Sequence, residues 1–208
     1  MNKKVLIART AAGALGGLLL LGAAGAAIAD ELDNGDVDVN VNIEALPPVG
    51  ALTMTVDSNA STLTESTSAD PEVRRFTGTL PTVTVTDDRE EVPAGAFWYV
   101  TGQASDFAGP GGASITAGHL GWSPRLLTEG NGEVAPGDEV GTVLDPQTDP
   151  NNVGVVDNDL LALALDSNDA RPTGEWKATA DLTLKTDKHV TPGAYSSTLT
   201  LTLWEDEF

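Results

Sequence analysis

Residues 36–44 read Asp-Val-Asp-Val-Asn-Val-Asn-Ile-Glu, and residues 199–203 read Leu-Thr-Leu-Thr-Leu. In both stretches apolar and polar side chains alternate strictly, and this period of two is typical of a β-strand with one buried and one solvated face. The same alternation returns, over shorter lengths, at residues 52–56, 83–86 and 182–184. Thr supplies much of the polar face, as suits an antiparallel sheet with one exposed side. We therefore predict strands at all five places, including 37–43 near the N-terminus.

The segments between these strands are rich in Gly and Pro, of which the chain has 22 and 12. Short strands separated by such residues are typical of a sandwich or barrel, so we predict an all-β fold, a single antiparallel β-sandwich. Residues 57–72 are predicted to form a surface loop, and residues 129–156 a long excursion from the sheet. Residues 160–165, Leu-Leu-Ala-Leu-Ala-Leu, fit a helix by composition and a buried strand by length, and we interpret them as a strand.

The first 29 residues differ in character from the rest of the chain. Lys3, Lys4 and Arg9 are followed by an Ala/Gly/Leu-rich run that ends in Ala27-Ile28-Ala29, and acidic residues come next. This order is typical of a secretory signal peptide. The apolar run is nearly long enough to span a bilayer, so an uncleaved anchor is the alternative. We predict a signal peptide over 1–29, a sandwich over 30–208 with no membrane span, and a secreted, extracellular location.

The chain is strongly acidic, with 31 Asp and Glu against 11 Lys and Arg, a formal charge of −20 at pH 7. Removal of residues 1–29 takes away three bases and no acid, which makes the charge −23. Such a polyanion is repelled by phosphate backbones, so we expect no nucleic-acid partner. The absence of Cys excludes disulfides, thiolate metal sites and a cysteine nucleophile, and in an exported chain it fits a bacterial exterior.

The acidic loops are the first candidates for chemistry. Three of them resemble calcium-ligand spacings, because hard cations bind several oxygens from a short loop: Asp87-Asp88, Asp157-Asn158-Asp159 and Asp166-Ser167-Asn168-Asp169. None completes the twelve-residue calcium loop, and solvated surface is the alternative, so calcium is the one cofactor considered. A glycoside hydrolase needs two carboxylates at a fixed separation, but 31 acids would supply such a pair in any fold. His119 and His189 belong to no catalytic pattern, so we predict no catalytic residue.

Aromatic residues are few, and this makes the four Trp informative. Exposed Trp and Tyr rings stack on sugars, whereas buried ones fill a sandwich core. We interpret Trp98 as a core residue and leave both interpretations open for Trp204, which lies in an acidic tail.

Further stretches carry a family resemblance: residues 77–89 (Thr-Gly-Thr-Leu-Pro-Thr-Val-Thr-Val-Thr-Asp-Asp-Arg), residues 98–107 (Trp-Tyr-Val-Thr-Gly-Gln-Ala-Ser-Asp-Phe) and residues 191–203 (Thr-Pro-Gly-Ala-Tyr-Ser-Ser-Thr-Leu-Thr-Leu-Thr-Leu). Over roughly residues 37–204 the chain resembles the WxL-type cell-wall-associated surface domain of Gram-positive bacteria, in the variant form of actinobacterial secreted proteins. It departs from the family in having Val100 where Leu is usual and in lacking the Trp of the second motif. The resemblance implies these binding residues: Trp98, Tyr99, Val100, Tyr195, Leu199, Leu201 and Leu203.

The resemblance also implies a function, namely non-covalent attachment to cell-wall peptidoglycan and assembly with other exported surface proteins. A covalent sortase anchor is not expected, because residues 205–208 are Glu-Asp-Glu-Phe rather than a basic tail. Our leading hypothesis is a non-enzymatic surface protein associated with the wall. The alternative is a structural subunit that assembles by strand exchange, since long regular strands such as 37–43 or 199–203 serve β-augmentation. A secreted glycan hydrolase is the third hypothesis.

Overall fold

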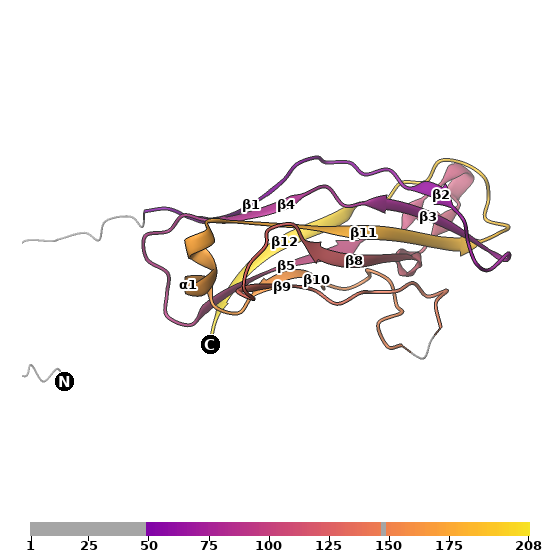
Figure 1. Ribbon diagram of the computed structural model, residues 1–208. Coiled ribbons are helices and arrows are strands. Elements are labelled where there is room, and N and C mark those ends of the chain that lie inside the picture. Colours follow the sequence, from indigo (N-terminus) through magenta and orange to yellow (C-terminus); the bar gives the residue numbers. More distant parts are fainter. Residues whose placement is uncertain (1–48, 147–148) are drawn as a thin grey trace, which may run out of the picture. The chain divides into compact units, whose positions relative to one another are not determined.

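Two antiparallel sheets face each other in the computed structural model, which describes residues 49–146 and 149–208 (Figure 1). The first sheet has six strands: β1 (Leu52–Val56), β2 (Thr64–Ser66), β3 (Val73–Thr79), β4 (Val83–Asp87), β8 (Leu120–Leu126) and β11 (Glu175–Asp187). The second has four: β5 (Ala96–Ala104), β9 (Val134–Pro136), β10 (Asp159–Ala164) and β12 (Leu199–Glu207). A small arm pairs β6 (Phe107–Ala108) with β7 (Ser114–Ile115). The predicted all-β antiparallel sandwich is confirmed.

The long strand β11 organises the first sheet. Strands β3 and β4 follow one another along the same edge of β11, because Thr79 pairs with Asp181 and Val83 pairs with Ala178. Strand β8 pairs with residues 178–184 of β11, which overlap both of these partners, so it occupies the other edge. Outside β4 and β3 lie β1 and β2, which form the outermost line of this sheet.

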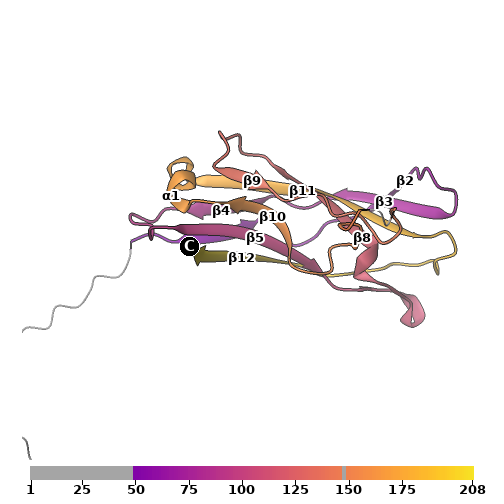
Figure 2. The same ribbon diagram turned by 90° about the horizontal axis from the view of Figure 1, so that it is seen from below.

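The second sheet is arranged in the order β12-β5-β10-β9, and Figure 2 looks onto it. Residues 160–165 were predicted to be a strand, and β10 confirms this over residues 159–164. The Leu/Ala composition does not produce a helix here, because both edges of the segment pair with other strands, β5 and β9. The bulge between Leu160 and Ala162 shifts the register within β10.

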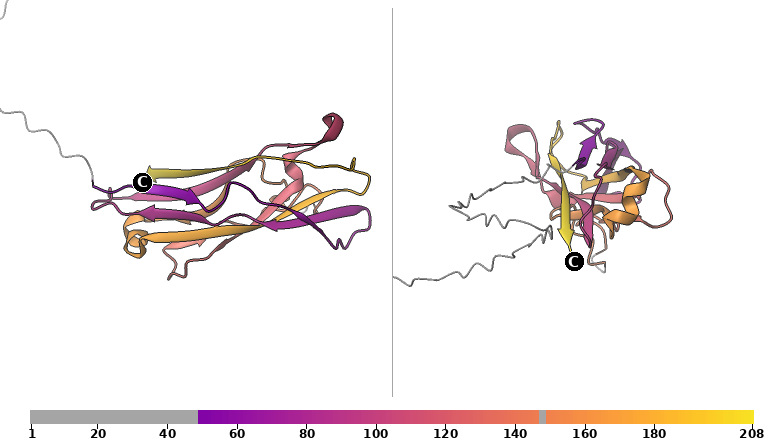
Figure 3. Two further views of the ribbon diagram at one scale, coloured as in Figure 1. Left: turned by 90° about the horizontal axis from the view of Figure 1, so that it is seen from above. Right: turned by 90° about the vertical axis from the view of Figure 1, so that its left-hand side faces the viewer.

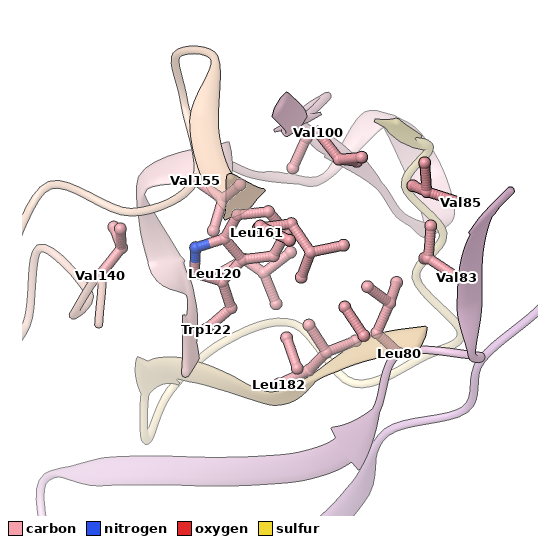
Figure 4. Packing of buried hydrophobic residues seen from close by; sticks show 14 of the residues in the cluster. Leu80, Val83, Val85, Val100, Leu120, Trp122, Val140, Val155, Leu161 and Leu182 are labelled. Carbon is pink, nitrogen blue, oxygen red and sulfur yellow. The ribbon is translucent and has the colours of Figure 1, made fainter. Parts of the chain in front are cut away.

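Buried side chains from both sheets fill the space between them (Figure 4). Trp98 from β5 and Trp122 from β8 are 1% and 2% exposed, so the interpretation of Trp98 as core is confirmed. Gly102 in β5 is required by this packing, since a Cβ atom there would lie 2.6 Å from Cη2 of Trp122.

The other strand predictions have mixed outcomes. Strands at 52–56, 83–86 and 182–184 are confirmed, and the one at 199–203 is part of β12, which continues to Glu207. Residues 64–66 correct the predicted loop over 57–72, because this segment pairs through its main chain with β3 and needs no apolar face to do so. Of the predicted excursion over 129–156, the described residues 129–146 and 149–156 are irregular apart from β9 and the bridge from Val140 to Trp122. The predicted strand at 37–43 and the signal peptide lie outside the described residues.

Helices are short in the described part of the chain. The α-helix is α1 (Ser167–Ala170), and the three 3-10 turns are η1 (Pro110–Gly112), η2 (Ala117–His119) and η3 (Arg171–Thr173). Among these residues no helix is long and apolar enough to cross a membrane.

The two long sides of the sandwich differ. On one side β8 of the first sheet contacts β9 and β10 of the second, which closes the core. On the other side the outermost strands are β1 and β2 of the first sheet and β12 of the second, and β1 runs beside β12 in Figure 3. Neither β1 nor β12 pairs with a further strand among the described residues. We call this the open side, and it is defined by the unpaired edges of β1 and β12.

Candidate functional site

The structure brings together most of the residues to which the resemblance points. Strand β5 carries Trp98, Tyr99 and Val100, and it pairs along its whole length with β12. Val100 lies directly opposite Leu203, and directly opposed residues share one face of a sheet. Because Val100 is buried, the three leucines of β12 (Leu199, Leu201 and Leu203) face the core on the same side, and all three are half-buried.

Tyr195 is placed differently. It precedes β12, which begins four residues later at Leu199, and so it lies beyond the β5–β12 pairing that holds Trp98. Its hydroxyl donates a hydrogen bond to the carbonyl oxygen of Thr191 at 2.9 Å. Its ring packs against the backbone of the β6–β7 arm, where a Cβ atom on Gly109 would lie 2.2 Å from Cε1 of the tyrosine. Tyr195 therefore fixes a loop rather than extending the strand.

An apolar groove begins on the open side. It encloses about 560 Å³ between β1, the residues that follow it, and β12. Its walls include side chains of both sheets, among them Met54, Leu63, Leu80, Leu182, Leu199 and Leu201. Because Leu80 and Leu182 are core residues with exposures of 6% and 5%, this groove reaches the hydrophobic core.

A second hollow of about 590 Å³ continues the groove past the end of β1. The two share Ser61, Leu63, Phe107 and Ser197 in their walls, so they are adjacent. The second hollow runs on to Phe76 and Tyr195. Together they form one channel along the open side, and we refer to both as the open-side groove.

The outer face of the second sheet, which faces away from the core, carries a row of aromatic rings. Tyr99 lies opposite Trp204 in the strand register, and their ring centroids are 6.2 Å apart with an angle of 17° between the planes. Phe97 stacks on Tyr99 at 6.0 Å and on Phe208 at 4.4 Å. Trp204 is 41% exposed, and its Nε1 donates to Oγ1 of Thr101 at 2.9 Å.

Sequence reasoning did not assign Phe97 and Phe208 to this row of aromatic residues. The signal that could have found Phe97 is its spacing of two from Tyr99, which places both rings on one face of a strand. Trp98, between them, points to the opposite face and is buried. Adjacent residues of one motif therefore have different roles, with Trp98 in the core and Tyr99 on the surface.

An ion-pair network links the two sheets at one end of the open side. Nη2 of Arg89 lies 2.7 Å from Oδ2 of Asp87, at the end of β4, and Nη1 lies 2.5 Å from Oε1 of Glu205 in β12. The hydrogen bonds that Arg89 donates to Asp87, and secondarily to Glu205, raise the pKa of Arg89 above its ordinary value. Asp87 is 6% exposed, so its carboxylate is occupied in a buried pair.

Two further members of the calcium candidates also have local partners. Asp88 accepts a hydrogen bond from the backbone N–H of Ala51 at 2.6 Å, and Asp166 accepts one from the N–H of Asn168 at 2.8 Å as the N-cap of α1. Burial, with the nearby charge of Asp157, raises the pKa of Asp159 to about 6. Within residues 49–146 and 149–208, no group of three or more His, Asp or Glu side chains is placed to hold a metal ion.

A third hollow of about 860 Å³, with polar and apolar residues in its walls, lies on the first sheet beside residues 139–146. Lys185 from β11 forms an ion pair there with Asp145. Burial alone would raise the pKa of Asp145, but hydrogen bonds from Lys185 and Thr142 outweigh it and lower the pKa. The two histidines lie elsewhere, with Nδ1 of His119 2.9 Å from Oγ1 of Thr116 and His189 in the turn after β11.

Comparison with known proteins gives no family. No protein-family model matches the chain, and no curated protein matches it. One solved structure to which it is similar is described as a family 123 glycoside hydrolase from Clostridium perfringens, studied for glycolipid glycan hydrolysis. That match has 16% identity and a TM-score of 0.30, and it covers 62% of this chain. The chain spans only 18% of the length of that hydrolase, and at this TM-score the likeness carries no argument about function.

Proposed function

We propose that this chain is a non-enzymatic, exported cell-surface protein that assembles with other exported chains, further copies of itself included, by accepting a β-strand on its open side. This proposal combines two hypotheses of the sequence analysis, namely assembly with other surface proteins and strand exchange between subunits. Cell-wall association would then follow from the assembly, which holds the protein among other surface components.

The observation that carries this proposal is the unpaired edge of β12 on the open side, together with the apolar groove beside it. Unpaired strand edges are the templates on which an added strand forms main-chain hydrogen bonds, and apolar pockets beside them select its side chains. Here the free edge of β12 lies next to an apolar groove that reaches the core, and Leu199 and Leu201 line it while only half-buried. An added strand would complete the burial of side chains that the chain alone leaves partly exposed.

The experiment tests assembly with two lysine substitutions on β12. Leu201→Lys places a charge on the open side, and its long stem can still lie along apolar surface, so the fold is expected to survive. Thr200→Lys is the matched control, because it adds the same charge one residue away on the exposed outer face. Residues 30–208 should form oligomers in light scattering and give a ladder after chemical cross-linking. Thr200→Lys should keep that ladder and Leu201→Lys should lose it, with thermal melts showing that both are folded.

Two results would contradict the proposal. One is a wild-type chain that stays monomeric at every concentration tested. The other is an identical ladder in the two lysine variants, which would place assembly elsewhere on the surface.

The stacked pair Tyr99 and Trp204 favours a second candidate, direct binding of wall glycan by the outer aromatic face. Aromatic rings offer apolar surface to the C–H faces of sugars. A pull-down on purified cell walls separates the two candidates. Trp204→Ala should abolish retention if the rings bind glycan, and should leave it unchanged if retention depends on assembly through the open side.

A further inference from the structure

We propose that the strand accepted by the open-side groove is residues 37–43 of a second copy of this chain. This inference rests on the proposed function and names the partner. The donor would lie along β12 with its valines and isoleucine in the groove and its Asp and Asn side chains in solvent.

The donor and the groove match in spacing. Val37, Val39, Val41 and Ile43 recur every second residue, which puts all four on one face of a strand. On β12 the half-buried leucines also recur every second residue, at Leu199, Leu201 and Leu203. A donor strand can therefore pair with β12 so that its valines and isoleucine lie beside these leucines along the groove. Its Asp and Asn side chains then point outward into solvent.

The length of the groove also fits a strand rather than a single side chain. It extends from Met54 and Leu201 at one end to Phe76 and Tyr195 at the other, through two adjoining hollows of about 560 and 590 Å³. Main-chain groups are available along β12, whose outer edge pairs with no other strand among residues 49–146 and 149–208. An extended segment with four apolar residues therefore has both a surface and an edge to occupy.

The path of the chain before β1 favours a donor from a second copy. The backbone N–H of Asp88 donates to the carbonyl of Ala51 at 3.3 Å, and that of Glu90 donates to Val49 at 3.1 Å. These bonds continue the antiparallel line of β1 away from the groove, which lies in the opposite direction beyond Met54. The sequence has Pro47 and Pro48 just before this point, and from the general preferences of proline we expect them to oppose a reversal toward the chain's own groove.

Exchange of this kind has a defined symmetry and charge dependence. The donor and the acceptor are different surfaces, so each copy donates to the next and the contact is head-to-tail, which produces an open filament unless a ring closes. The donor stretch 36–44 contains Asp36, Asp38 and Glu44 and no base, and the chain that accepts it is also acidic. Assembly should therefore strengthen as monovalent salt screens the repulsion.

The absence of Cys from the sequence allows a direct cross-linking test with residues 30–208. One preparation carries Asn40→Cys on the polar face of the donor. A second carries Thr200→Cys or Thr202→Cys on the outer face of β12, where cross-strand neighbours come within disulfide range. The matched control is Lys177→Cys, an exposed position on β11 of the other sheet. After mixing and mild oxidation, Asn40→Cys with Thr200→Cys or Thr202→Cys should give about tenfold more mixed dimer than with Lys177→Cys.

Three other results would each overturn the inference, and they differ in what they imply for the proposed function. Oligomers in light scattering without a preferred disulfide would mean that another strand or surface is used, and the proposed function would stand. An intramolecular disulfide in the Asn40→Cys/Thr200→Cys double variant would make the chain its own donor. No oligomers at all would contradict the proposed function as well.

A second pair of variants tests the donor face. Val39→Asp with Val41→Asp should abolish the oligomers, because carboxylates would then point into the groove. Asp38→Asn with Asn40→Ser alters the same segment on its polar face and should keep them. Loss of oligomers in both pairs, or in neither, would overturn the assignment of donor side chains.

Discussion

Two tryptophans on opposite faces of one sheet give the sharpest test of this structure. Trp98 is 1% exposed in the core, and its replacement by Ala removes a large buried side chain, at a cost of about 3–5 kcal/mol in the free energy of unfolding. Trp204 is 41% exposed, and Trp204→Ala loses part of that burial and the hydrogen bond to Thr101, about 1–2 kcal/mol together. For a domain of this size, 1 kcal/mol lowers Tm by about 2–4 °C. Trp98→Ala should therefore lower Tm by about 6–20 °C and Trp204→Ala by about 2–8 °C.

The assay is thermal unfolding of both variants and the wild type, followed by far-ultraviolet circular dichroism at one protein concentration. Urea unfolding at 25 °C gives the free energies independently, provided that the m-values agree. A domain of marginal stability has about 5–15 kcal/mol in total, so Trp98→Ala at its upper estimate would unfold a weak one outright. Equal losses in the two variants, or a larger loss for Trp204→Ala, would refute the assignment of these side chains to opposite faces.

The remaining predictions concern charge and packing. Asp159→Asn should raise the free energy of unfolding at pH 7 by about 1 kcal/mol, because it removes a charge that burial disfavours. This is less than the full pKa shift implies, since solvent screens the partly exposed carboxylate. Wild-type stability should rise from pH 7 to 5, because the folded chain protonates Asp159 near pH 6 and the unfolded chain near 3.8; urea titrations of both proteins check this. Gly102→Ala should cost about 1–3 kcal/mol in thermal melts, since its methyl would press on the Trp122 ring. Arg89→Met should cost about 3 kcal/mol in urea unfolding by leaving Asp87 buried without its cation.

Alternation of side chains predicted the strands that have one buried face. It worked at residues 199–203 because Thr and Leu there do face opposite sides of a sheet. It missed β3, β5 and β8, whose apolar and polar residues do not alternate in the sequence. It also missed β2 and β9, whose three-residue pairings depend on main-chain hydrogen bonds and need no apolar period. Residues 160–165 were ambiguous from composition alone, and the pairing with β5 and β9, which are distant in the sequence, decides for a strand.

The candidate site was predicted only in part. The family resemblance pointed to Trp98 and to the leucines of β12, and the structure places these on neighbouring strands. No local pattern shows that β1 and β12 are the edges of their sheets, because the edge position depends on the pairing of every other strand. The groove between them is therefore a property of the whole topology. Phe208 joined the aromatic row for the same reason, through a ring contact with Phe97 far away in the chain.

The position of β12 also governs when the protein can fold. Trp204 and Thr101, which share a hydrogen bond across the second sheet, are 103 residues apart in the chain. Contacts of such long range are made slowly, because a large loop must close before they form. The core lacks the half-buried leucines of β12 until residue 203 has left the ribosome, and up to that moment the nascent chain lacks one edge of its second sheet. Under the proposed function, a sandwich that closes this late would keep the chain in the unfolded state that export through a translocation channel requires.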